Sequence, residues 1–237
     1  MSDPLRIALA CEGPTDFIVI RAAVRAIFPD RDVVWQLLQP EISASFVPAG
    51  RELGLGWSGV YHWCRLAAKE GEGRLSGSAL FGFHDVLIVH VDADVAAMTY
   101  RSAGISDESE DLPCSKPCPP AVATTDALRR VMFRWIGETA VPARCVFCTP
   151  SQSTEAWVIA ALYPKNPSME KRGWECYETP DAQLGQQPKK KRIRKSAKDY
   201  SAKEAELTAA WPTVEKLSEA ARFSGDFKTA ASQVSVP

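Results

Sequence analysis

The chain has no long apolar segment and almost no net charge, and both absences exclude broad classes of protein. None of its apolar runs approaches the roughly 20 residues that a membrane-spanning helix needs. The first residues, Met-Ser-Asp-Pro, lack the basic and then apolar pattern of a secretion signal. With 28 Lys and Arg against 29 Asp and Glu, the formal net charge is −1, so the chain as a whole does not attract nucleic acid or anionic lipid. We therefore expect a cytoplasmic protein without membrane contact, in which any polyanion binding comes from a local basic patch.

The sequence also lacks the phosphate-binding motifs of nucleotide hydrolases. No Walker sequence and no Asp-x-Asp-x-Thr sequence is present, so NTP hydrolysis would belong to a partner protein. Residues 54–59 (Gly-Leu-Gly-Trp-Ser-Gly) have the form of a dinucleotide fingerprint, but no long apolar strand precedes them and no acidic residue ends a strand about 20 positions later. For this segment we expect a flexible loop that covers the functional site.

Seven cysteines form an odd set without a secretion signal, which predicts reduced thiols and no disulfide framework. Cys114 and Cys118, together with Cys145 and Cys148, are the residues that would form a four-thiolate Zn²⁺ site. The second pair lies in a predicted strand, where residues three apart point to opposite faces. Zn²⁺ is therefore disfavoured, and most of the cysteines are expected to be small core residues.

Apolar runs and amphipathic segments alternate along most of the chain. With 46% hydrophobic and 24% charged residues, the chain has the composition of an ordinary globular protein with a substantial core. Helical periodicity predicts helices at 16–28, 60–69, 121–137 and 153–162, and apolar runs predict strands at 5–10, 33–38, 86–91 and 144–148. This alternation predicts an α/β fold, with a mostly parallel sheet flanked by helices on both faces.

The alternation of apolar runs and amphipathic segments ends at about residue 163. We expect an α/β domain over 1–163, with an insertion at about 41–83 before the strongest predicted strand. Residues 164–200 contain four prolines and a basic run, which is typical of a linker. Residues 201–237 favour helix, with Pro212 as a break, and are interpreted as a helical C-terminal tail.

Carboxylates follow two of the predicted strands directly. Glu12 and Gly13 end the first strand, and Asp92 and Asp94 follow the strand at 86–91. The carboxyl ends of parallel strands meet at one edge of a sheet, where α/β proteins bind their ligands. The glycine allows a sharp turn, and the Asp-x-Asp spacing puts both side chains on one face. Oxygen ligands of this kind suit Mg²⁺ completed by a substrate phosphate, although carboxylates that only cap turns remain the alternative.

Three further residues near these motifs have more than one interpretation. Asp16 falls in the first turn of a predicted helix and is interpreted as a charge that favours the helix dipole. His90 shares a strand face with Asp92, so it is either a group that tunes this carboxylate or a buried, hydrogen-bonded core histidine, and the core role is favoured. Glu155 is either an N-terminal helix carboxylate or a fourth acidic member of the site, and we include it among the candidate metal ligands. Trp157 is expected in the core.

Together, Glu12-Gly13 and Asp92-x-Asp94 resemble the signature of the TOPRIM domain, which is shared by topoisomerases, bacterial-type primases and OLD-family nucleases. The resemblance implies a TOPRIM/Rossmann-like fold, general acid or base work for Glu12, and Mg²⁺ held by Asp92 and Asp94, with Mn²⁺ as the alternative ion. The segment Thr154-Glu155-Ala156-Trp157 is similar to an element of small stand-alone TOPRIM-like proteins of phage-defence loci. The resemblance covers about residues 5–163.

A basic run lies in the predicted linker. It is either a solvated linker or a nucleic-acid-binding strip, because a nearly neutral enzyme that acts on a polyanion needs local positive charge. The candidate phosphate contacts in this run are Lys189, Lys190, Lys191, Arg192, Arg194 and Lys195.

Three functions therefore remain open at the level of sequence. The first is a Mg²⁺-dependent TOPRIM-like nuclease that acts on DNA or RNA, in anti-phage defence with an ATPase partner. The second is a non-catalytic interaction module that docks on such a partner. The third is a small-molecule phosphotransferase or phosphatase, which is the weakest of the three because the sequence shows no motif for a nucleophile or a phosphate-binding loop. The sequence does not indicate an oligomeric state.

Overall fold

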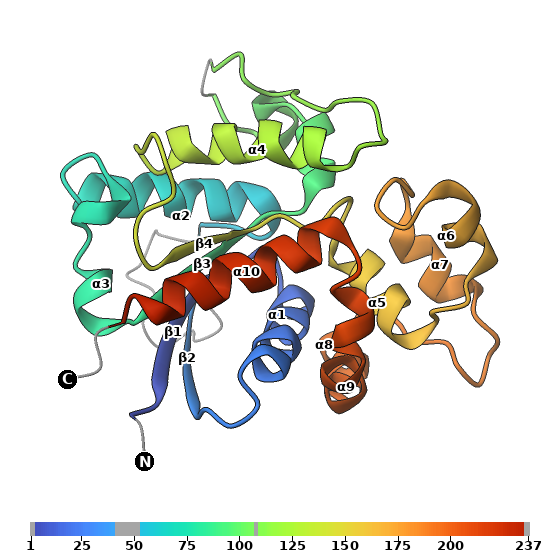
Figure 1. Cartoon of the computed structure of the whole chain (residues 1–237). Coiled ribbons are helices and arrows are strands. Elements are labelled where there is room, and N and C mark those ends of the chain that lie inside the picture. The colour runs from blue at the N-terminus through green and yellow to red at the C-terminus, as the bar shows by residue number, and fades with distance from the viewer. Residues whose placement is uncertain (1–2, 41–52, 107–108, 235–237) are drawn as a thin grey trace.

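A four-stranded parallel sheet forms the centre of the computed structural model, which describes residues 3–40, 53–106 and 109–234. The strand order is β2-β1-β3-β4 (Figure 1). The strands are β1 (Leu5–Ala10), β2 (Val33–Gln39), β3 (Val86–His90) and β4 (Cys145–Cys148). Every position of β3 and β4 is buried, as expected of parallel strands covered on both faces. The predicted α/β class with a parallel sheet is confirmed.

The strand order brings distant parts of the sequence to one edge. Leu9 of β1 lies beside Leu37 of β2 and Ile88 of β3, so β1 and β3 are neighbours although about 75 residues separate their ends along the chain. Because all strands run in the same direction, the turns that follow β1, β3 and β4 meet at the carboxyl edge of the sheet.

Helices cover both faces of the sheet (Figure 1). On one face lie α2 (Gly56–Glu70) and α4 (Val122–Trp135). An aromatic cluster packs here, in which the ring centroid of Tyr61 lies 5.5 Å from that of Tyr100 and 5.5 Å from that of Trp135. The other face is covered by α1 (Pro14–Ile27), α5 (Thr154–Leu162), α9 (Glu204–Val214) and α10 (Ser218–Ser232). Alternate β1 residues supply the two cores, as the strand period requires.

The C-terminal helices belong to the same core as the sheet. Trp211 of α9 meets Trp157 of α5 edge-on at 5.4 Å between ring centroids, and Phe223 of α10 lies 6.0 Å from Trp157. Helix α9 also packs on α1, and α10 packs on β4. Pro212 lies inside α9, and the break between the two helices comes at residues 215–217. The predicted helical tail is therefore helical, and it covers one face of the sheet.

The remaining elements are short. The predicted linker, 164–200, contains α6 (Pro167–Arg172), α7 (Pro180–Gln186) and α8 (Ala197–Ser201). Within the predicted insertion, residues 41–52 lie outside the described residues, and α2, η1 (Leu75–Gly77) and α3 (Leu80–Phe83) occupy the rest. Two further 3₁₀ helices, η2 (Ala93–Ala97) and η3 (Tyr100–Ala103), follow β3.

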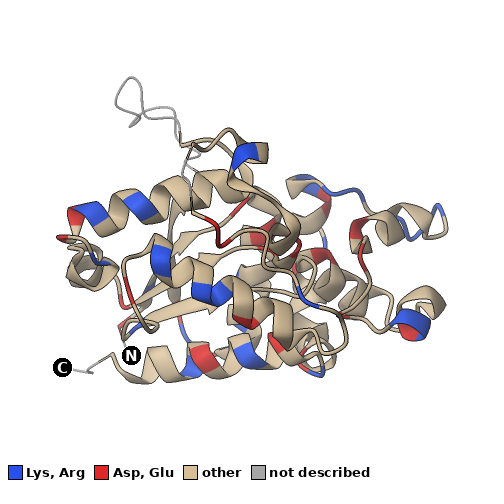
Figure 2. Ribbon diagram, turned by 90° about the horizontal axis from the view of Figure 1, so that it is seen from above, with Lys and Arg blue, Asp and Glu red and all other residues tan. Residues whose placement is uncertain are grey.

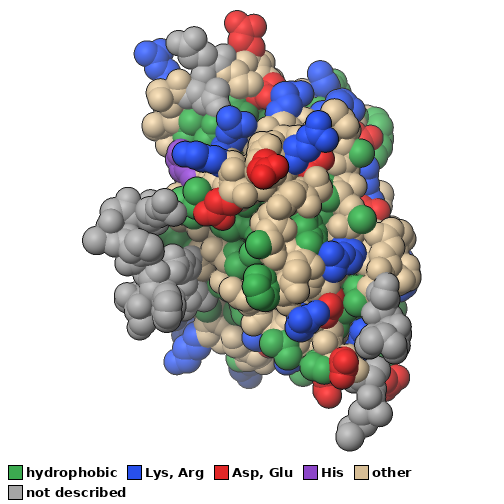
Figure 3. Space-filling view, turned by 90° about the vertical axis from the view of Figure 1, so that its left-hand side faces the viewer, with side chains coloured by type: hydrophobic (Ala, Val, Ile, Leu, Met, Phe, Trp, Pro, Cys, Tyr) green, Lys and Arg blue, Asp and Glu red, His purple; other side chains and the backbone are tan. Residues whose placement is uncertain are grey.

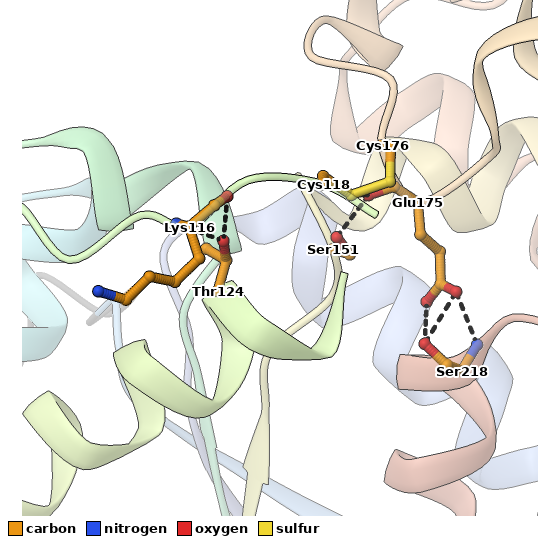
Figure 4. Close-up of a disulfide and its surroundings, with 7 residues drawn as sticks. All are labelled: Lys116, Cys118, Thr124, Ser151, Glu175, Cys176 and Ser218. Carbon is orange, nitrogen blue, oxygen red and sulfur yellow. Dashed lines mark hydrogen bonds between the residues drawn. A yellow bond between two sulfur atoms is a disulfide. The ribbon is translucent and has the colours of Figure 1, made fainter. Parts of the chain in front are cut away.

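One disulfide, between Cys118 and Cys176, corrects the expectation that all thiols are reduced (Figure 4). It ties the Pro- and Cys-rich loop before α4 to the segment between α6 and α7, which the sequence pattern had no means of pairing. Glu175 in that segment accepts hydrogen bonds from the backbone N–H groups of Ser218 and Glu219 at the start of α10. Because Cys118 is in a disulfide and Cys145 and Cys148 are separately buried in β4, the four cysteines of the unfavoured Zn²⁺ site are not free to bind together.

The surface on the side of α3 carries both hydrophobic and charged side chains. Figure 3, from the side on which α3 lies, shows hydrophobic side chains among charges of both signs, and Phe83 of α3 is 68% exposed. Within the described ranges, none of the helices combines the length and the apolar composition that crossing a bilayer requires.

Candidate functional site

The candidate site forms where the turns after β1, β3 and β4 meet. Gly13 adopts an extended conformation with φ of −157°, and Pro14 then begins α1 at a position where its missing N–H costs nothing. The turn after β3 is joined to the turn after β4 by hydrogen bonds from Ala93 N–H to the Pro150 carbonyl and from Asp94 N–H to the Gln152 carbonyl. The three turns therefore form one connected edge.

Glu12 and Asp92 lie in direct contact at this edge. The backbone N–H of Asp92 donates a 2.8 Å hydrogen bond to Oε1 of Glu12. The carbonyl of Glu12 accepts a 3.0 Å hydrogen bond from the N–H of Gly56, which begins α2. The glycine-rich segment expected to cover the site is thus mostly the first turn of a helix that contacts Glu12, and Gly56 adopts a φ of +69° that favours glycine.

Asp16, His90 and Asp92 form a buried cluster in which one potential ligand atom from each lies within 4.8 Å of the others. Nε2 of His90 lies 3.1 Å from Oδ1 of Asp92. The same Oδ1 accepts a 3.1 Å hydrogen bond from the N–H of Thr154 at the start of α5, and the Thr154 hydroxyl donates to Oδ1 of Asp16 at 2.7 Å. Helix α5 therefore holds the two carboxylates together through one residue.

Burial, together with the proximity of these groups to one another, shifts their pKa values. Burial raises the pKa of Glu12 well above its ordinary value, and the neighbouring Asp92 carboxylate adds to this rise. Burial also raises the pKa of Asp92, although the hydrogen bond from His90 opposes the change. Burial alone would lower the pKa of His90, but the carboxylates of Asp16 and Asp92 outweigh it and raise the pKa to about 9. Negative charge in the buried cluster is therefore unfavourable by itself, and added positive charge stabilises it.

Glu155 is fully buried and is already held by other side chains. Its Oε2 accepts a 2.8 Å hydrogen bond from the Ser153 hydroxyl and lies 3.0 Å from Nζ of Lys195, and its Oε1 accepts a 3.1 Å hydrogen bond from the Tyr200 hydroxyl. Both carboxylate oxygens are occupied. Glu155 therefore anchors Lys195 beside the acidic cluster and is poorly placed to be a metal ligand.

The basic run lies on the exposed loop between α7 and α8. Figure 2 shows acidic residues gathered near the middle of the molecule and Lys and Arg residues on the helices and loops around them. Lys189, Arg192, Arg194 and Lys198 contribute to the lining of a cavity of about 740 Å³. Of the run's six side chains, Lys195 alone forms an ion pair with a described carboxylate. Lys195 thus connects the cationic loop to the acidic edge.

Carboxylate oxygens remain available for a cation. Oδ2 of Asp16, Oδ2 of Asp92 and Oε2 of Glu12 receive no hydrogen bond from any described residue. Nδ1 of His90 is buried and likewise has no hydrogen-bond partner in the described part of the chain. Carboxylate oxygens are the donors that Mg²⁺ and Mn²⁺ prefer, so the residues present fit a divalent cation.

The structure brings together some of the candidate residues and adds others. Glu12 and Asp92 are adjacent, and Asp94 follows on η2 with an exposed side chain. Asp16 lies in the first turn of α1, and His90 is a buried histidine hydrogen-bonded to Asp92, as the sequence predicted. Their position with Asp92 in one cluster was not predicted. The available signals were the position of Asp16 in the first turn of the helix that follows Glu12 and Gly13, and the shared strand face of His90 and Asp92.

Comparisons with protein-family models, curated proteins and solved structures find no match to this chain. The functional interpretation therefore depends on the geometry and chemistry of the site.

Proposed function

We propose that this protein is a Mg²⁺-dependent phosphoryl-transfer enzyme, a TOPRIM-like nuclease that acts on DNA or RNA. The observation that carries the proposal is the convergence of Glu12, Asp16 and Asp92 at the carboxyl edge of the parallel sheet. Each has a carboxylate oxygen without a donor among the described residues, and the site is one at which α/β folds bind ligands. The two clustered carboxylates of Asp16 and Asp92, with Glu12 hydrogen-bonded to the backbone of Asp92, favour a bound cation.

Asp16 and Asp92 are the residues that would hold Mg²⁺ or Mn²⁺, with Asp94 at the exposed rim for water-mediated contact. The bound ion supplies positive charge and Lewis acidity to a phosphate oxygen. Glu12 is suited to moving a proton, because its raised pKa lets the carboxyl group hold or release one closer to neutral pH. His90 and the N–H of Thr154 orient Asp92 from behind.

The positive charge needed to bind a polyanion lies beside this edge. Lys195 contacts Glu155, and the unpaired cations of the same loop continue away from it. A nucleic-acid strand that followed this loop would neutralise their charge and reach the acidic edge, where the metal offsets the repulsion between phosphate and carboxylates. A role in phage defence with an ATPase partner is part of the proposal. It is supported by the resemblance of the residues around Glu12 and Glu155 to those of small stand-alone TOPRIM-like proteins of phage-defence loci.

The proposal is tested by incubating the purified chain with plasmid, single-stranded DNA and tRNA in the presence of Mg²⁺, Mn²⁺ or EDTA. We expect cleavage of at least one polymer with a metal and none with EDTA. The Asp92→Ala, Asp94→Ala double variant and Glu12→Gln should lose the activity, while Asp30→Asn, a control at an exposed carboxylate, should retain it.

Cleavage retained by the double variant would contradict the proposal. Complete inertness of the folded wild-type chain with every polymer and metal would instead favour a non-catalytic module that docks on a partner protein.

A further inference from the structure

A second cavity lies at the opposite end of α5 from the acidic edge. It has a volume of about 490 Å³ and is formed by the end of α5, the start of α6 and the end of α7. Helix α5 runs from Thr154 to Leu162, so the two sites are about 12 Å apart along its axis. The volume lies within the range of small-ligand pockets, which is roughly 300–1,000 Å³.

The wall of this cavity combines flat apolar surfaces with amide groups. Tyr163 and three prolines supply the apolar surfaces, and the side chains of Gln186 and Gln187 supply amides. Nε2 of Gln187 donates to the Gln183 carbonyl, whereas its Oε1 has no partner among the described residues. An aromatic or proline surface beside amide donors and acceptors is the chemistry that recognises an unstacked nucleobase.

Positive charge lies at the same cavity. Lys165 and Lys191 both line it, and neither forms an ion pair with a described carboxylate. Two unneutralised ammonium groups beside a base-sized pocket provide a place for the phosphate of a nucleotide.

A single turn separates this cavity from the cationic one. The N–H of Lys191 donates to the Pro188 carbonyl at 2.7 Å, Nε of Arg192 donates to the Gln187 carbonyl at 3.3 Å, and the Tyr163 hydroxyl donates to the Lys191 carbonyl. The turn is therefore held on both sides. Lys191 lines the base-sized cavity, whereas Lys189 and Arg192 line the cationic cavity.

We propose that the cavity between α5, α6 and α7 binds a nucleotide, with the base against Tyr163 and the glutamine amides and the phosphate near Lys165 and Lys191. The nucleotide is either free or part of a single strand whose backbone continues over the cationic cavity. A base can enter only when it is unstacked, so duplex DNA is excluded from this pocket. The inference goes beyond the proposed nuclease function, because binding here needs neither metal nor cleavage.

The experiment is fluorescence anisotropy in EDTA with a labelled 12-residue single-stranded DNA, an abasic strand of the same length and a duplex of the same sequence. Base stacking on proteins contributes roughly 1–3 kcal/mol. We therefore expect the normal strand to bind about tenfold or more tightly than the abasic strand and the duplex. Equal binding of the normal and abasic strands, or of single strand and duplex, by the wild-type chain would overturn the inference.

Substitutions at Ser168 provide a matched pair. Ser168 is an exposed residue on α6 that lines the cavity, so Ser168→Trp fills it while Ser168→Ala leaves it open. We expect Ser168→Trp to remove the preference for the normal strand without weakening abasic-strand binding, and Ser168→Ala to bind as the wild type does. A full preference retained by Ser168→Trp contradicts the proposal, provided that circular dichroism shows both variants folded.

Competition with 5′-AMP distinguishes the two sources of the nucleotide. Displacement of the labelled strand from the wild type, but not of the residual binding to Ser168→Trp, identifies the free nucleotide as a ligand. A preference for the normal strand without displacement identifies the polymer.

Discussion

Oε1 of Glu12 accepts a 2.8 Å hydrogen bond from the backbone N–H of Asp92, which joins two residues 80 positions apart in the sequence. The bond follows from the pairing of β1 with β3, since each residue lies just beyond the end of its strand. It fixes the carboxylate of Glu12 against the segment that supplies Asp92 to the buried cluster. The proposed catalytic group and the proposed metal site are therefore positioned by the same contact.

Asp16→Asn should weaken Mn²⁺ binding more than Asp94→Asn does. Asn retains the acceptor for the Thr154 hydroxyl but loses the charge of a clustered carboxylate, whereas Asp94 is exposed. Loss of a ligand should cost at least the roughly 10- to 100-fold in metal affinity that is lost when a side chain hydrogen-bonded to a ligand is substituted. Isothermal titration calorimetry measures both variants against Asp30→Asn. A larger effect of Asp94→Asn would move the metal away from the Asp16, His90 and Asp92 cluster.

Saturating Mn²⁺ should raise the thermal midpoint of the wild-type chain and leave that of Asp92→Asn nearly unchanged. A ligand at about 100 times its Kd adds about 2.7 kcal/mol of stability, which corresponds to roughly 5–10 °C for a chain of this size. Differential scanning fluorimetry with and without EDTA measures the shift. The same rise in both proteins would show that the ion binds elsewhere.

Asp85→Asn should change how stability depends on pH. Hydrogen bonds from the Arg6 guanidinium lower the pKa of Asp85, although burial opposes the change. The folded state is therefore favoured where Asp85 is charged, so its contribution is present above about pH 4 and is lost as pH falls through the lowered pKa. Urea midpoints of the wild type and the variant should differ at pH 7 and converge in acid. A difference that is constant with pH would refute the role of the charge.

Trp211→Ala should destabilise the whole protein and not only its C-terminal helices. Trp211 is 3% exposed, packs against Trp157, and donates from its indole N–H to the Ser224 hydroxyl at 3.1 Å. Substitutions of this kind cost about 3–5 kcal/mol. Urea unfolding should show one cooperative transition at lower urea, while Leu55→Ala, at a side chain 73% exposed, should have little effect. A separate early transition would indicate that the tail unfolds independently.

Cys118→Ser should lower stability under oxidising conditions by about 2–4 kcal/mol, because the disulfide joins residues 58 positions apart. The wild type should lose the same amount when a reductant is added, and the variant should not respond. Cys114→Ser, at a free and partly buried cysteine, is the control. An equal response of the wild type and Cys118→Ser to reductant would contradict the prediction.

Strand-forming segments and the acidic turns were accessible from the sequence because both are local. The four strands begin and end within one residue of their predicted limits, since continuous apolar runs such as 86–91 have few alternatives. Glu12 and Asp92 could be associated because both end such runs. The Cys118–Cys176 bond and the packing of α9 and α10 into the core could not be predicted, because nothing local specifies which distant segments pair.

The sequence by itself determined the parallel α/β architecture and the edge at which carboxylates gather, because neighbouring residues determine where an apolar strand forms and where it ends. Only the tertiary structure decided which groups surround that edge. The Thr154 hydroxyl contacts Asp16 across 138 positions, and Lys195 and Tyr200 contact Glu155 from a segment that the local sequence predicts to be a linker. These contacts arise from the burial of α5 between the sheet and the C-terminal helices, which depends on the packing of the whole chain.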